Sequence, residues 1–267
     1  MALSARRPSL HRRAVYAAAA AVFAFLLLPL AVILPVSFTS AEYLAFPPPG
    51  FSLRWYEAFL ADRAWLAAGL RSLRIAGVVT IVATVLGTLL AFSIVRGRYP
   101  GRGLVSQIAT APLAVPTIVY SVAVYGLFST LKLIGQWHGV ALAHTVHALP
   151  FVVLIVGAAL RTLDPAQEQA AMGLGASRLG ALWRVTLPQL RPALVSAAFL
   201  AFISSFDELV IAMFLGGADV TLPKKMFDNI QMEIEPTVAA VSVLQIALAA
   251  LVLSIAARFG SGAKVLN

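Results

Sequence analysis

The sequence predicts an all-α integral membrane protein with six transmembrane helices, and two observations support this prediction. Hydrophobic residues make up 60% of the 267 residues and charged residues only 12%, with a mean hydropathy of +0.90. A soluble domain is about half apolar and about a quarter charged, so water cannot be the only solvent of this chain. Six stretches also reach the roughly 20 mostly apolar residues that a membrane-crossing helix needs.

We place the six spans, in chain order, at residues 14–36, 73–95, 104–131, 140–160, 193–215 and 237–257. Pro112 and Pro116 interrupt the third span, which predicts a break that membranes tolerate where neighbouring groups satisfy the freed carbonyls. The resulting organisation is a basic N-terminus, an anchor helix, an outer loop, a core of five spans that contains a long inner loop, and a tail. These parts cover residues 1–13, 14–36, 37–72, 73–260 with its loop at 161–191, and 261–267.

The first span resembles a secretory signal peptide in one respect, because Arg6, Arg7, Arg12 and Arg13 precede it. Its apolar run is longer than the roughly 7–15 residues of a signal-peptide core, and no convincing small-residue cleavage site follows. We therefore interpret this span as an uncleaved anchor.

Basic residues predict the orientation of the spans. With the N-terminus inside, the inner segments hold thirteen basic and two acidic residues, whereas the outer segments hold seven of each. Lys and Arg accumulate on the cytoplasmic side of membrane proteins, so both termini are predicted to be cytoplasmic. The net charge of +9 has the same explanation and does not call for nucleic acid as a partner. The absence of cysteine excludes a disulfide framework and a cysteine-ligated metal.

The outer loop combines a turn with an aromatic segment. Pro47, Pro48, Pro49 and Gly50 predict an extended stretch and a turn. Residues 51–66 carry four aromatic side chains, which favours a short helix at the membrane interface. These side chains are Trp55, Tyr56, Phe59 and Trp65. An ordinary amphipathic connector explains the same pattern.

The inner loop at 161–191 predicts two short helices joined at a glycine. Asp164 and Pro165 are typical of a helix start, and Glu168 in the first turns suits the helix dipole. We expect Gly175 to end this helix, Ser177 to cap a second short one and Pro188 to close the unit. The small side chains of Ala166, Ala170 and Ala171 form one face of the first helix. Such a hairpin offers a compact knob for a groove on another protein, or alternatively lies on the membrane surface.

The spacing within this loop resembles the EAA motif of binding-protein-dependent ABC importer permeases. That motif runs Glu-Ala-Ala, three residues, Gly, nine residues, Ile, one residue and Leu-Pro. The matching positions are Gln169, Ala170, Ala171, Gly175, Val185, Leu187 and Pro188, with Ala176 following the glycine. Gln169 stands where the motif has Glu, and Val185 where it has Ile. Since Glu168 immediately precedes Gln169, either residue could make the contact that the motif's Glu provides.

The resemblance implies a type I ABC importer permease in the bacterial inner membrane, without a catalytic site or cofactor of its own. The loop would be the coupling helix that docks on a dimer of ATPase subunits, which use ATP and Mg²⁺. The other implied partners are a second related permease, as a heterodimer, an external solute-binding protein and membrane lipid. The chain lacks the G-x-x-x-x-G-K-[ST] phosphate loop, so energy must come from another subunit.

Further segments resemble the second permease component of spermidine/putrescine transporters. They are Phe51-Ser52-Leu53-Arg54-Trp55-Tyr56, Ser72-Leu73, Ala143-His144-Thr145, Pro150-Phe151, Ser205-Phe206-Asp207-Glu208 and Thr221-Leu222-Pro223. This resemblance implies a polyamine or a related small nitrogenous solute as the cargo.

Two adjacent acids fall inside the predicted fifth span. A charged side chain at mid-bilayer costs about 2.5–3.5 kcal/mol on insertion scales and normally faces a protein interior or a wet cavity. One interpretation is that Ser205, Phe206, Asp207 and Glu208 line the translocation pathway and attract a cation. The other is that neighbouring groups, such as Ser204 and Ser205 or a partner subunit, satisfy the two carboxylates.

Two other polar groups have less specific patterns. His144 and His147 lie three residues apart on one helical face, which suits either a metal or, without a clear third ligand, a hydrogen-bonded pair between helices. Between the fifth and sixth spans we expect an outer loop of mixed charge, which is either merely solvated or a docking site for the binding protein. Its charged residues are Lys224, Lys225, Asp228, Glu233 and Glu235.

Two other classes of function compete with the importer interpretation. A self-sufficient, ion-coupled secondary transporter usually shows paired repeats and more spans; it would not need an ATPase. An integral membrane enzyme would need a catalytic group, but the sequence has no H-E-x-x-H zinc motif. The acidic pair at Asp207 and Glu208 has no evident nucleophile or metal nearby.

Overall fold

The computed structural model describes residues 10–218, 220–232 and 234–260, and this part of the chain is built of helices. Five helices are long and apolar enough to cross a membrane, and the number is six if one pair of helices bent by 106° is counted as a single span. The predicted all-α membrane fold is therefore confirmed. Four of the five helices are α1 (Leu10–Val36), α3 (Arg63–Arg96), α6 (Trp137–Thr162) and α12 (Thr237–Gly260), and the fifth is the helical run at 178–206 that ends in α9 (Leu187–Phe206).

The chain divides into two units, Met1–Asp62 with Asn229–Ile246 and Arg63–Asp228 with Ala247–Asn267. In the first unit, α1 is followed by a loop in which Thr39 and Phe51 form an isolated bridge, and by α2 (Arg54–Ala61). The Trp55 indole donates to the carbonyl of Ala41 at 3.2 Å. The predicted short aromatic helix is thus present, although it ends at Ala61, and Trp65 belongs to α3.

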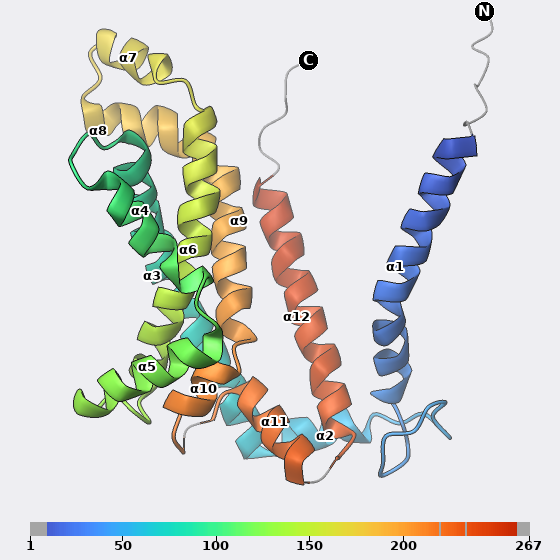
Figure 1. Ribbon diagram of the computed structural model, residues 1–267. Helices are drawn as coiled ribbons and strands as arrows, with labels where there is room; N and C mark the ends of the chain where they lie inside the picture. The colour runs from blue at the N-terminus through green and yellow to red at the C-terminus, as the bar shows by residue number, and fades with distance from the viewer. Residues whose placement is uncertain (1–9, 219, 233, 261–267) are drawn as a thin grey trace, which may run out of the picture. The chain divides into compact units, whose positions relative to one another are not determined.

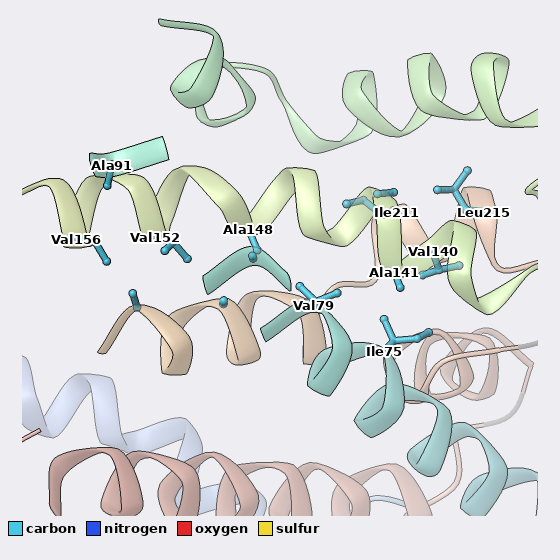
Figure 2. Close-up of a cluster of buried hydrophobic side chains, with 14 of the residues drawn as sticks. Ile75, Val79, Ala91, Val140, Ala141, Ala148, Val152, Val156, Ile211 and Leu215 are labelled. Atoms are coloured by element: carbon cyan, nitrogen blue, oxygen red, sulfur yellow. The ribbon is translucent and has the colours of Figure 1, made fainter. Parts of the chain in front are cut away.

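The second unit is organised around α3, α6 and α9, which pack on one another. Their buried residues recur every three or four positions, as a helix face requires. Figure 2 shows this cluster, with Ile75 and Val79 of α3 near Val140, Ala141 and Ala148 of α6. Many of the buried side chains are alanines, and small residues let helices approach closely where lipid supplies no hydrophobic driving force.

The backbone of α3 lies close to α6 at Gly87. A Cβ atom on this residue would lie 2.6 Å from the Cβ of Val152, far inside van der Waals contact. A side chain at this position would therefore force a shift of α6, which glycine avoids.

The third span is bent by 106° between α4 (Arg102–Thr110), continued by η1 (Ala111–Leu113), and α5 (Thr117–Thr130). Pro112 lies in η1 and Pro116 immediately precedes α5. Proline cannot donate a backbone hydrogen bond and restricts the residue before it. The predicted break is confirmed at these two positions.

Three expectations about other boundaries are wrong. The fifth span ends at Phe206 instead of continuing to residue 215, and a separate α10 (Val210–Leu215) follows. Pro188 does not close the loop unit, because α8 (Arg178–Ala181) continues through the π-helical turn η2 (Leu182–Thr186) directly into α9, where proline is tolerated in the first turn. The expected outer loop after the fifth span contains a helix, α11 (Leu222–Met232).

Both ends of the α3–α6–α9 bundle are capped by short helices (Figure 1). α7 (Ala166–Gly173) and α8 lie at one end, and α5 and α10 at the other. The residues with candidate functions fall at these two ends.

Candidate functional sites at the two ends of the bundle

The α7–α8 hairpin has the predicted start and turn. Asp164 Oδ1 accepts a hydrogen bond at 2.9 Å from the backbone N–H of Ala166, the first residue of α7. Gly175 has φ +92°, a left-handed conformation that glycine adopts readily. Ser177 Oγ accepts from the backbone N–H of Gly180 at 3.0 Å and caps α8. The local sequence signals for this hairpin are confirmed.

The two candidate contact residues at the start of α7 lie in different surroundings. Glu168 is three-quarters buried, and its Oε2 accepts from Arg96 Nη1 at 2.8 Å. Its Oε1 accepts a hydrogen bond from the hydroxyl of Thr186. Gln169, by contrast, is exposed. Glu168 is therefore occupied within the chain, whereas Gln169 is available to another protein.

The hairpin presents apolar side chains to its surroundings. The exposed fractions of Leu174, Leu179 and Trp183 are 90%, 67% and 65%. Leu179 and Trp183 are four residues apart and so share a helix face. Sequence reasoning missed both, although this spacing was visible. Of the motif residues, Ala170 and Pro188 are exposed, and Ala171, Ala176, Val185 and Leu187 are half-buried.

A cavity of about 680 Å³ lies between α7, α8 and the end of α3. Its lining includes Arg96, Arg98, Arg178, Gln169 and Met172. Because Arg96 is paired with Glu168, the other two arginines give this cavity a positive character. An acidic or apolar element of a partner fits such a surface better than a basic one.

At the opposite end, the break between α9 and α10 carries the two predicted pathway acids, so neither lies within a helix. Glu208 Oε1 accepts from the backbone N–H of Ile211 at 3.0 Å, in the first turn of α10. Its Oε2 lies 3.9 Å from His147 Nε2. The side chain of Asp207 is exposed and has no hydrogen-bond or ion-pair partner among the described residues.

Ser205 does not satisfy either acid. Its hydroxyl is buried and lies 2.9 Å from His144 Nδ1, which links α9 to α6. The predicted interhelical hydrogen bond of the histidine pair is therefore confirmed for His144. In the described part of the chain, no group of three metal-ligating side chains surrounds the pair. Phe206 is buried and stacks on Phe202, with ring centroids 5.5 Å apart.

Sequence reasoning also missed Tyr120 on α5. Its hydroxyl donates to the carbonyl of Ala143 at 2.8 Å, and its ring centroid lies 6.0 Å from that of His147. The bent third span therefore contacts α6 beside the α9–α10 break. There the ring of Tyr120 lies near His147, which in turn lies near Glu208.

The charges expected in an outer loop lie largely on α11. Lys224 pairs with Asp228 at 2.7 Å, one turn apart, and the Lys225 ammonium lies 5.4 Å from the centroid of the Trp65 ring. Glu235 follows α11, and Glu233 is outside the described residues. These contacts leave a docking role for this segment as a hypothesis.

Comparison with known proteins places these features in context. Residues 83–262 match the family model described as "Binding-protein-dependent transport system inner membrane component". The putrescine transport system permease protein PotI of Escherichia coli is 35% identical over 230 residues, which is 83% of this chain and 82% of that protein. The spermidine/putrescine transport system permease protein PotC of Haemophilus influenzae is 32% identical over 229 residues, or 85% and 88% of the two chains.

The fold also matches solved structures. A bacterial ABC transporter involved in the import of the acidic polysaccharide alginate aligns with a TM-score of 0.70, covering 97% of this chain and 99% of that one. The sequence identity is 16%, so this likeness concerns the fold alone.

Proposed function

The chain belongs to the family of binding-protein-dependent transport system inner membrane components, and on this premise we propose that it is the permease subunit of a polyamine importer. The observation that carries the proposed solute is the 35% identity to a putrescine permease over 83% of the chain. Polyamines are cationic, and an exposed carboxylate such as that of Asp207, without a partner among the described residues, suits a cationic solute.

ATP-driven movement would enter this permease through the α7–α8 hairpin. The exposed apolar side chains of Leu174, Leu179 and Trp183 support this role, because large apolar residues exposed together mark interaction surfaces. Ala170 and Gln169 are exposed on the same hairpin. The proposed occupant of this surface is an ATPase subunit, which also supplies ATP and Mg²⁺.

The solute would pass near the α9–α10 break. Asp207 and Glu208 would attract the cation, with Ser205 and Phe206 as neighbouring residues of the pathway. The support comes from the end of α9 at Phe206, which leaves both acids outside a helix. At membrane depth, such non-helical backbone is tolerated only where it is buried in protein or lines a water-filled cavity. The remaining proposed partners are a related permease, an external solute-binding protein and surrounding lipid, with both termini cytoplasmic.

Reconstitution tests the proposal directly. The chain, its companion permease, the ATPase and the solute-binding protein would be placed in liposomes with internal ATP, and uptake of labelled putrescine and spermidine measured. We expect uptake that requires both ATP and the binding protein. A divalent anion such as sulfate serves as the control solute. Uptake of that anion alone would refute the polyamine assignment, and uptake driven by an ion gradient without ATP would favour a secondary transporter.

A further inference from the structure

Glu168 joins three separate segments of the chain through its two carboxylate oxygens. It lies on α7, accepts from Arg96 at the end of α3 through Oε2, and accepts from Thr186 at the end of η2 through Oε1. These contacts span 72 and 18 residues of sequence. A single side chain therefore connects the hairpin to the ends of two spanning helices.

The surroundings make these contacts stronger than an ordinary surface pair. The side chains of Arg96 and Glu168 are 25% and 24% exposed, and Thr186 is buried at 1%. Exposed ion pairs contribute little because water screens them, whereas partial burial and a charged acceptor strengthen a hydrogen bond. Glu168 is thus held in place from both sides.

The two segments that Glu168 reaches are well suited to receive a movement. Arg96 is the last residue of the 34-residue helix α3, which at 1.5 Å per residue is about 50 Å long. Buried residues run along its whole length, so a displacement of its end is carried by a packed helix. Thr186 ends a π-helical turn, a feature often found at functional sites, and α9 starts at the next residue.

A second contact between α7 and α9 provides a natural comparison. Gln189 Nε2 donates to Gln167 Oε1 at 2.7 Å, between two exposed and uncharged side chains. It reaches α9 but not α3. The neighbouring Gln169 is exposed and lines the cavity beside Arg96, although it occupies the motif's usual Glu position.

We propose that Glu168 is a positioning residue that transmits movement of α7 to α3 and α9 together, while Gln169 and the apolar surface of the hairpin meet the ATPase. This inference rests on the proposed function of the hairpin. It divides two tasks between adjacent residues: contact with the partner by Gln169, and relay within the permease by Glu168.

The test measures transport per ATP hydrolysed in the reconstituted complex. In Glu168→Gln and Arg96→Gln, we expect the ATPase to co-purify and to hydrolyse ATP, while solute uptake per ATP falls about tenfold, because a hydrogen bond to a charged group is lost or weakened. Arg96→Lys keeps the charge and is expected to retain most of the coupling. Gln167→Ala, which removes only the neutral contact, is the matched control and is expected to keep the wild-type ratio.

Each outcome separates the inference from its premise. Loss of ATPase co-purification in Glu168→Gln, with normal assembly of Gln169→Ala, would show that Glu168 is the external contact and overturn the inference. An unchanged ratio in both Glu168→Gln and Arg96→Gln would overturn it as well. If the wild-type complex shows no ATP-dependent uptake at all, the proposed function fails and the inference falls with it.

Discussion

The two ends of the α3–α6–α9 bundle use their carboxylates differently. At the α7–α8 end, Glu168 is held between Arg96 and Thr186, which belong to other segments of the chain. At the α9–α10 end, Glu208 accepts from the first turn of the helix that follows it, and Asp207 has no partner in the described part of the structure.

This difference matches the two proposed roles, transmission of movement at the α7–α8 end and attraction of a solute at the α9–α10 end. Contacts between distant segments resist their separation, so the contacts of Glu168 support the proposed transmission of movement from the α7–α8 end into the helices. Glu208 caps the helix that follows it and lies 3.9 Å from His147 of α6, whereas the exposed carboxylate of Asp207 has no partner among the described residues. An unpaired carboxylate also keeps its hydrogen-bonding capacity for a cation.

The largest effect is expected for Gly175→Val. The φ of +92° is unfavourable for any residue with a Cβ and most for a β-branched one, so the hairpin would adopt a different turn. We expect uptake to be abolished while the protein still inserts, measured by transport and by membrane fractionation. Gly173→Val is the matched control, because Gly173 lies at the end of α7 with open space around it. Normal uptake by the Gly175 variant would show that transport does not depend on this turn.

A substitution in the middle of the bundle, between its two ends, is expected to lower the free energy of unfolding. Gly87→Ala places a Cβ 2.6 Å from that of Val152 and forces α3 and α6 apart, which costs about 1–3 kcal/mol for overpacking. Gly77→Ala on the same helix meets nothing within 4 Å and is expected to be neutral or slightly stabilising. Thermal unfolding of the two purified variants measures the difference, and equal stability would contradict the close packing.

At the α9–α10 end, charge removal is expected to lower uptake of a cationic solute several-fold. Asp207→Asn is expected to have the larger effect because the Asp207 carboxylate has no partner in the part of the chain that the structure describes. Glu208→Gln keeps an oxygen that can accept from Ile211. Transport assays over a range of putrescine concentrations, with assembly checked by co-purification, measure both. Unchanged uptake in the two variants would leave the acids with a structural role only.

The smallest effect is expected for Ser177→Ala, which removes the cap of α8. Loss of a helix N-cap costs about 1 kcal/mol, and this cap is exposed. We expect faster hydrogen exchange at Gly180 with uptake nearly intact, whereas Ser177→Thr keeps the cap and the protection. Protection that is equal in Ser177→Ala and the wild type would show that the cap does not hold this turn.

Much of the coupling hairpin was predictable because its signals are local. Asp164, Gly175 and Ser177 act on backbone groups within three residues, so their order along the chain is enough to place a cap, a turn and another cap. The six spans were predictable for a similar reason, since their length and hydropathy follow from the thickness of the bilayer. The bend at Pro112 and Pro116 follows from proline chemistry alone.

The end of α9 at Phe206 was not predicted, because the residues that follow it up to position 215 are mostly apolar and could continue a span. Two acids interrupt that run, and the helix stops before them, where Glu208 can accept a backbone hydrogen bond at the start of α10. Apolar content alone does not distinguish a continuous helix from one that ends to provide this cap.

By itself, the sequence determined the membrane class, the five continuous apolar spans, the hairpin and the similarity of its spacing to importer permeases. These properties depend on composition and on residues that are close together in the chain. The tertiary structure alone decided that Glu168 binds Arg96, 72 positions away, while Gln169 stays exposed. Partners so distant in sequence are brought together by the packing of α3, α6 and α9, and no local pattern records which side of a helix that packing will cover.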